Sequence, residues 1–146
     1  TGSPFPPVNG YRISENNNCF SFPGIGLGAV LSRAKVISDT MISAAVDQLA
    51  ALSPLEEGNS KPGLLPPLEV IQDTSSKVAT AVILQALKEG SARIEEEDVP
   101  GETGKKVKVP RDFDQCLAWV KNQMWEPRYR PMIKVDHDPT FHSHQI

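Results

Sequence analysis

Apolar side chains recur at helical spacing in three stretches of this chain. In the first, Ser38 is a typical N-cap, and Asp39 suits the positive end of the helix dipole. Ile37 and Ile42 occupy the positions of a hydrophobic staple around that cap. The pattern predicts a helix that Pro54 prevents from continuing much further. Its inner face would comprise Met41, Ile42, Ala45, Val46, Leu49 and Leu52.

Two more amphipathic helices are predicted downstream. Pro66-Pro67 is suited to open a helix, and Gly90 is a typical C′ residue beyond its end. Asp112 is the expected cap of the last helix, which Pro127 closes. The stripe of the first of these helices comprises Ile71, Val78, Val82, Ile83, Ala86 and Leu87. The inner face of the last comprises Phe113, Cys116, Leu117, Val120 and Met124.

The segment 25–31 is apolar but rich in glycine. Each glycine weakens an isolated helix by about 1 kcal/mol relative to alanine. We therefore expect a helix here only if another element packs closely against it. Residues 1–18 favour turns and extended chain, and the polar stretch 91–111 is typical of a solvated loop in which Val107 and Val109 could add a short strand.

This pattern predicts a mainly α fold that is incomplete on its own. One-sided helices must bury their stripes against something, and no segment of period two is long enough for a central strand. A three-helix bundle would bury them, but the loops 54–66 and 91–111 are longer than bundle connections usually are. We expect helices that decorate a framework from a longer chain, and the absence of an initial Met favours the same interpretation.

Composition excludes several classes of function. A net charge of −3 gives no basic face for nucleic acid, and two cysteines are too few for a disulfide framework or a cysteine-only zinc site. No apolar run reaches the roughly 18 residues of a membrane span, and the start lacks the features of a signal peptide. We expect a soluble chain without nucleic-acid or membrane partners.

Three motifs resemble sites but have simpler interpretations. The run Gly24-x-Gly26-x-x-Ala29 matches a loose dinucleotide-binding fingerprint. That fingerprint requires a β-strand directly before the first glycine, and Pro23 at this position does not suit one. Close helix packing explains the glycines better. The histidines at the end of the chain have no element to fix metal geometry, so a disordered terminus is preferred; they are His137, His142 and His144.

The cysteines also favour a structural interpretation. Cys116 lies on an apolar helix face, where a small buried hydrophobe is the default. Cys19 follows three asparagines but has no histidine partner of the kind that a nucleophile needs.

Several blocks, in order, closely resemble the C-terminal part of malic enzymes. They are Thr1-Gly2-Ser3-Pro4-Phe5, Asn17-Asn18 leading into Phe22-Pro23-Gly24-Ile25-Gly26-Leu27-Gly28, Ile37-Ser38-Asp39, and Leu65-Pro66-Pro67-Leu68. The resemblance is close over residues 1–90 and loose over 91–135. It does not extend to 136–146.

The resemblance implies an organisation for the chain. Residues 1–90 would be the C-terminal part of an α/β (Rossmann-like) substrate and NAD-binding region, whose parallel sheet comes from earlier sequence. Residues 91–135 would be a small extension, with the Trp119–Tyr129 region in contact with other subunits of a homo-oligomer, a dimer or tetramer. Residues 136–146 are expected to be a disordered tail.

The resemblance also implies a reaction. Malic enzymes convert malate to pyruvate and carbon dioxide, reducing NAD or NADP with the help of Mg²⁺ or Mn²⁺. In the family, the lysine and tyrosine that transfer protons, the acidic metal ligands, the malate-binding arginine and the dinucleotide fingerprint all lie upstream of the similar segment. We therefore assign no catalytic, cofactor or metal residue here, and expect the piece alone to be inactive and to bind no cofactor tightly. The compartment, mitochondrial or cytoplasmic, is left open.

One functional position does carry over from the family. The first asparagine of its Asn-Asn pair binds a malate carboxylate and aligns with Asn17, and Asn18 follows it. A neutral amide suits a carboxylate that must leave as carbon dioxide, because strong ionic stabilisation of the ground state would raise the barrier. Because Asn16 is also an asparagine, the alignment of the family's pair with this chain is left open by one residue.

Two alternatives differ in class. The chain could be a small helical interaction or oligomerisation module without catalytic activity, indifferent to malate and cooperative in unfolding. A minimal nucleotide binder built on Gly24–Ala29 is the third possibility.

Overall fold

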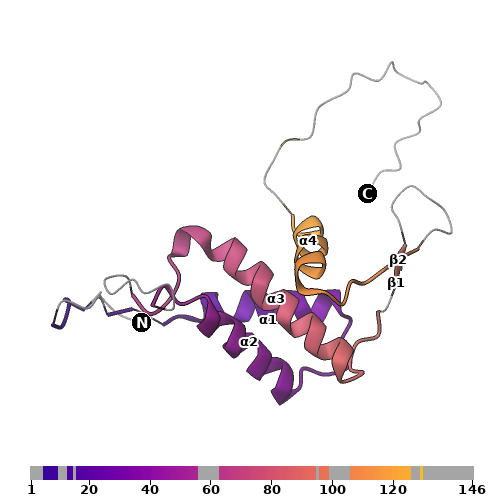
Figure 1. Ribbon diagram of the computed structural model, residues 1–146, viewed down its shortest axis with the longest axis horizontal. Coiled ribbons are helices and arrows are strands. Elements are labelled where there is room, and N and C mark those ends of the chain that lie inside the picture. Colours follow the sequence, from indigo (N-terminus) through magenta and orange to yellow (C-terminus); the bar gives the residue numbers. More distant parts are fainter. Residues whose placement is uncertain are drawn as a thin grey trace, which may run out of the picture.

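The computed structural model describes residues 5–9, 13–14, 16–55, 63–94, 96–98, 106–125 and 129. The described part is mainly helical, as predicted (Figure 1). Its helices are α1 (Phe22–Leu31), α2 (Asp39–Ala51), α3 (Ile71–Lys88) and α4 (Phe113–Gln123), and its single 3₁₀ turns are η1 (Asn18–Phe20) and η2 (Leu68–Val70). Two short strands, β1 (Glu96–Asp98) and β2 (Lys106–Lys108), pair antiparallel. Val107 thus lies in a strand, as the sequence indicates, while Val109 follows it and is buried.

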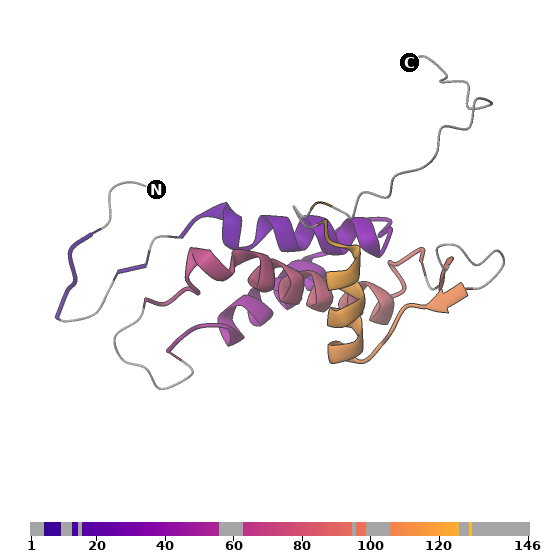
Figure 2. The same ribbon diagram turned by 90° about the horizontal axis from the view of Figure 1, so that it is seen from above.

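Helix α3 is the centre of the fold. Helices α1 and α2 pack along it, and α4 crosses it (Figures 1 and 2). Two clusters of buried side chains meet on α3. One consists of Ala79, Ile83, Ile94, Val109, Cys116 and Val120. The other consists of Met41, Ala45, Val78, Val82 and Ala86.

The glycine-rich segment forms α1 because α3 packs closely against it. A Cβ atom on Gly24 would lie 2.6 Å from the Cβ atom of Val78, and one on Gly28 would lie 2.7 Å from that of Val82. These distances are too short for any side chain, so the glycines allow the two backbones to approach. The prediction of close packing is confirmed. The helix begins at Phe22, earlier than the apolar stretch alone indicates.

Helix α2 begins as predicted but buries less of its surface than predicted. The Ser38 side chain accepts a hydrogen bond from the Met41 N–H at 3.2 Å, which confirms the cap. The prediction was wrong for Ile42 and Val46, which are 43% and 56% exposed. The reason is that α2 packs mainly on one neighbour, α3, through a narrow stripe that includes Met41 and Ala45. The next residue along lies about 100° around the helix and points away.

The staple proposed around the start of α2 does not bury its two members. Ile37 is 44% exposed and Ile42 is 43% exposed. Helix α2 is instead joined to the end of α3 by Glu89, whose carboxylate accepts hydrogen bonds from the hydroxyls of Ser38 and Thr40.

The residue after α3 and the cap of α4 are those that the sequence predicts, whereas α4 ends at Gln123 and Pro127 lies outside the described residues. Pro67 caps η2, which leads directly into α3, and Gly90 follows α3 with a φ of +73°. The Asp112 side chain accepts from the Gln115 N–H at 3.1 Å and caps α4. The Lys121 ammonium of α4 lies 2.6 Å from the Asp73 carboxylate of α3, which ties the two helices together.

Large apolar side chains remain on the outer faces of α1 and α2. Phe22 and Val30 are 71% and 72% exposed, and Ile42 and Val46 on α2 are also largely exposed. In the part of the chain that the structure covers, no helix combines the length and apolar character needed to cross a bilayer.

Candidate functional site

The asparagine pair lies at the start of the helical body. Asn17 is the N-cap of η1, and its side-chain Oδ1 accepts a hydrogen bond from the Cys19 N–H at 3.0 Å. Its backbone carbonyl accepts from the Phe20 N–H at 3.2 Å. Asparagine favours such a position because its side chain pairs with backbone a few residues on.

These two bonds determine what Asn17 offers to a ligand. Only the oxygen of the amide can accept from the Cys19 N–H, so the cap also fixes which end of the amide is Nδ2. In the described ranges, no side chain or carbonyl accepts from Nδ2. Asn17 and Asn18 are both exposed. The outward group of Asn17 is therefore a neutral N–H donor, which suits a carboxylate.

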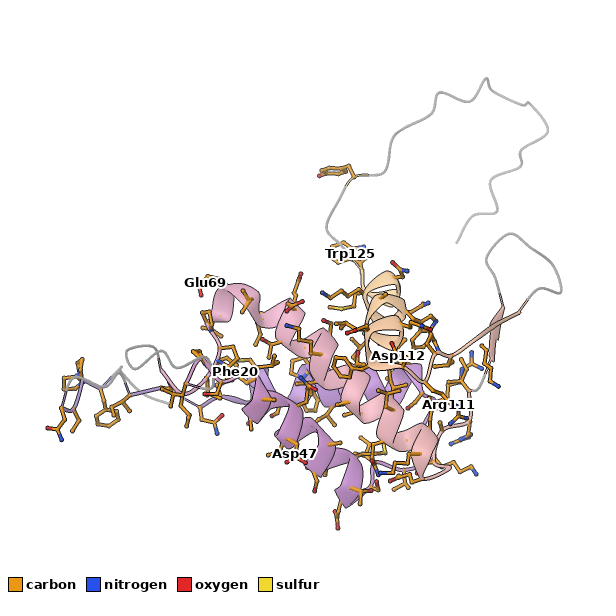
Figure 3. The ribbon with its side chains drawn as sticks, in the orientation of Figure 1. Phe20, Asp47, Glu69, Arg111, Asp112 and Trp125 are labelled. Carbon is orange, nitrogen blue, oxygen red and sulfur yellow. The ribbon has the colours of Figure 1, made fainter. Side chains whose placement is uncertain are left out.

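The segment that carries Asn17 is attached to the body on both sides. Downstream, Phe20 is 6% exposed and buried at one end of the helices (Figure 3). Upstream, the Ser14 Oγ accepts from the Leu65 N–H at 3.4 Å, across 51 residues of sequence. Sequence reasoning missed the contact with Leu65, because no local signal pairs residues so far apart.

The glycine run does not form a phosphate-binding turn. A dinucleotide fingerprint places its glycines between a strand and a helix. Here Gly24 and Gly28 lie within α1 and face α3, and η1 precedes the helix. The packing interpretation accounts for both glycines.

The two cysteines are both free but differ in burial. Burial raises the pKa of the Cys116 thiol to about 11, which keeps it protonated and inert at neutral pH. Cys19 is partly buried, and its backbone N–H donates to the side chain of the capping residue Asn17.

No metal site forms among the described residues: they contain no group of three histidine, cysteine or acidic side chains close enough to hold an ion. His137, His142 and His144 lie outside the described residues. The side chains within the described ranges therefore do not form a site that fits a divalent cation.

A shallow hollow of about 470 Å³ lies far from the asparagine pair. It is lined by Leu84, Leu87, Lys88 and Arg111. Arg111 and Phe20 lie at opposite ends of the helical body (Figure 3), so this hollow is separate from the candidate site.

Comparison with known proteins gives a consistent result. The family described as "Malic enzyme, NAD binding domain" matches residues 1–87. Over its whole length the chain is 75% identical to the mitochondrial NAD-dependent malic enzyme of Saccharomyces cerevisiae. It is 34% identical to the NAD-dependent malic enzyme of Schizosaccharomyces pombe over 91% of the chain, and 40% identical to that of Pseudomonas syringae over 89%. The chain spans only 21% to 22% of the length of these relatives.

Proposed function

Because this chain belongs to the malic enzyme family, we propose that it is the C-terminal part of an enzyme that oxidises and decarboxylates (S)-malate to pyruvate and carbon dioxide while reducing NAD. The support is the family match over residues 1–87 and the relatives, which are NAD-dependent malic enzymes. The chain corresponds to about a fifth of their length, 22% of the yeast enzyme. The complete reaction therefore requires much more protein than this.

In this proposal the chain contributes to substrate binding and to the fold, and the rest of the enzyme performs the chemistry. The described residues contain no cluster that could hold Mg²⁺ or Mn²⁺, and the glycine run lies within α1 instead of in a nucleotide-binding turn. The metal, the NAD and the groups that transfer protons belong to the remainder of the enzyme. In this proposal the isolated chain is inactive.

Asn17 is the residue through which this chain touches the substrate. Its Oδ1 is held by the Cys19 N–H, so its Nδ2 is the group directed to a malate carboxylate. A neutral donor orients the substrate without adding strong ionic stabilisation, which would be lost as carbon dioxide forms. Asn18, also exposed, is the neighbouring amide of the same site.

The outer faces of the helices complete an α/β domain in this proposal. Phe22 and Val30 on α1, and Ile42 and Val46 on α2, are exposed apolar side chains that a sheet from the rest of the enzyme would cover. Trp125, 82% exposed beyond the end of α4 (Figure 3), belongs to a separate surface that would contact another subunit of a homo-oligomer.

A chimeric enzyme tests this proposal. We would replace the matching segment of the yeast malic enzyme with this chain, which is 75% identical to it, and measure NADH formation from malate. The chimera should be active, whereas the isolated chain should produce no NADH. An inactive but folded chimera would favour the alternative of a non-catalytic helical module, and turnover by the isolated chain would contradict the division of roles.

The asparagine assignment is tested in the same chimera. Asn17→Ala should raise the KM for malate about tenfold or more, because a hydrogen bond to a charged group is lost. Asn122→Ala on the exposed surface of α4 is the matched control and should leave both constants unchanged. If Asn16→Ala and not Asn17→Ala raises the KM, the register is wrong by one residue. If neither does, the site is wrong.

A further inference from the structure

We propose that Ser14 is a positioning residue for Asn17, held in place by the loop 63–65. This inference rests on the proposed function, because it concerns how the candidate malate-binding asparagine is held. It assigns a role to a segment 51 residues away in sequence that would not touch the substrate.

The loop 63–65 is itself fixed to the helical body. Ser53, which follows α2 and is 8% exposed, donates from its Oγ to the Leu64 carbonyl at 2.7 Å. The next residue, Leu65, donates its N–H to the Ser14 Oγ at 3.4 Å. A continuous set of contacts thus joins the end of α2 to the segment that carries Asn17.

Gly63 makes the fit between loop and segment close. It is buried, and a Cβ atom at this position would collide with the Ser14 Oγ and lie 3.3 Å from the Ser14 Cβ. An added Cβ would fit only if the Ser14 hydroxyl rotated away, which would break its hydrogen bond with the Leu65 N–H.

Asn17 lies between two attachment points. Ser14 is three residues before it and the buried Phe20 is three residues after it. Three residues span at most about 10 Å, so fixing both ends limits where the amide can go. Restricting a binding group before the ligand arrives lowers the entropy lost on binding, which strengthens substrate affinity.

The test uses the chimeric enzyme and compares single and double substitutions. Ser14→Ala removes one hydrogen bond and should raise the KM for malate about threefold. Gly63→Ala pushes against the Ser14 hydroxyl and should raise it further, to about tenfold, by displacing the segment. The double variant Ser14→Ala/Gly63→Ala removes the conflict, so its KM should return to that of Ser14→Ala.

Two further readouts and a control substitution separate positioning from a general structural effect. The KM for NAD and the Tm should stay within error of the parent chimera in Ser14→Ala, because the contact acts on the malate site alone. Asn122→Ala on the exposed surface of α4 is the control. It should leave both KM values and the Tm unchanged.

The inference would be overturned by a double variant as impaired as Gly63→Ala, or by Ser14→Ala leaving the malate KM unchanged. Should Gly63→Ala fail to fold, Ser14→Ala alone decides. An effect of Asn17→Ala without any effect of Ser14→Ala would reject only the positioning role. No effect of Asn17→Ala would reject the proposed site itself.

Discussion

Helix α3 and the two helices beside it differ sharply in the fraction of their residues that is buried. Nine of the eighteen residues of α3 are buried, against two of ten in α1 and two of thirteen in α2. The described residues supply neighbours on several sides of α3. Within the same residues, α1 and α2 have few contacts beyond those with α3.

This difference shows which helices find their packing partners within the described residues. Around α3 even the buried hydroxyls are satisfied within the chain: Thr80 donates to the Ser76 carbonyl at 2.8 Å, and Ser76 donates to the Asp73 carbonyl at 2.8 Å. On the outer faces, apolar side chains such as Phe22 and Val46 remain in contact with solvent. Apolar surface of this kind is typical of an interface with more protein.

The largest predicted effect is at the contact between α1 and α3. Gly28→Val should lower the free energy of unfolding of the purified chain by about 3 kcal/mol, because its Cβ would lie 2.7 Å from Val82 and 2.9 Å from the Ala79 carbonyl. Urea titration followed by circular dichroism measures the change. Gly26→Ala on the open side of α1 should instead raise stability by about 0.5 to 1 kcal/mol. Equal effects at the two glycines would contradict the described packing.

A second prediction compares two valines of different burial. Val82→Ala, fully buried on α3, should cost about 2 kcal/mol through lost burial and a small cavity. Val46→Ala, 56% exposed on α2, should cost less than about 0.5 kcal/mol in the purified chain. The same urea titration applies. A large loss at Val46 would show that the outer face of α2 is already covered.

A smaller effect is expected between α3 and α4. Hydrogen bonds from Lys121 and Lys77 lower the pKa of Asp73, so the stabilisation is present at neutral pH and is lost as the pH falls below the ordinary aspartate range. The partners are substantially exposed, so Asp73→Asn should cost only about 0.5 to 1 kcal/mol at pH 7. As the pH falls through the lowered pKa of Asp73, the variant and the parent should converge, and a constant difference would exclude this ion pair as the cause.

The smallest effect is expected at the junction of α2 and α3. Hydrogen bonds from Thr40, then Ser38 and Ser91, hold the pKa of Glu89 at about 2, below its usual 4.5. The ionised carboxylate therefore favours the folded state above pH 4.5, and this contribution disappears as the pH falls toward 2. Glu89→Gln should flatten the pH dependence of Tm in that window. An unchanged profile would mean that the junction is too solvated to matter.

Local signals predicted the ends of the elements well. The caps at Ser38 and Asp112 and the glycine after α3 follow from contacts within a few residues, and all three are confirmed. The buried face of α2 could not be predicted in the same way. Periodicity shows which residues share a side, but the width of the buried stripe depends on how many neighbours the helix has.

The candidate site divides in a similar manner. The hydrogen bond that orients Asn17 joins residues two apart, and asparagine is a residue type that favours such a capping position. Its assignment to malate came from a family resemblance and remains a prediction. The contact between Ser14 and Leu65 joins residues 51 apart, which no periodic or capping pattern could have revealed.

The central claim is that protein outside this chain covers the outer face of α2, and Val46→Asp tests it most directly. The measurement is the change in Tm that this substitution causes in the purified chain and in the chimeric enzyme. We predict a shift of less than about 2 °C in the chain, where Val46 is already exposed, and a loss of more than about 5 °C in the chimera, where a charge would be buried. An equally small shift in both would contradict the claim.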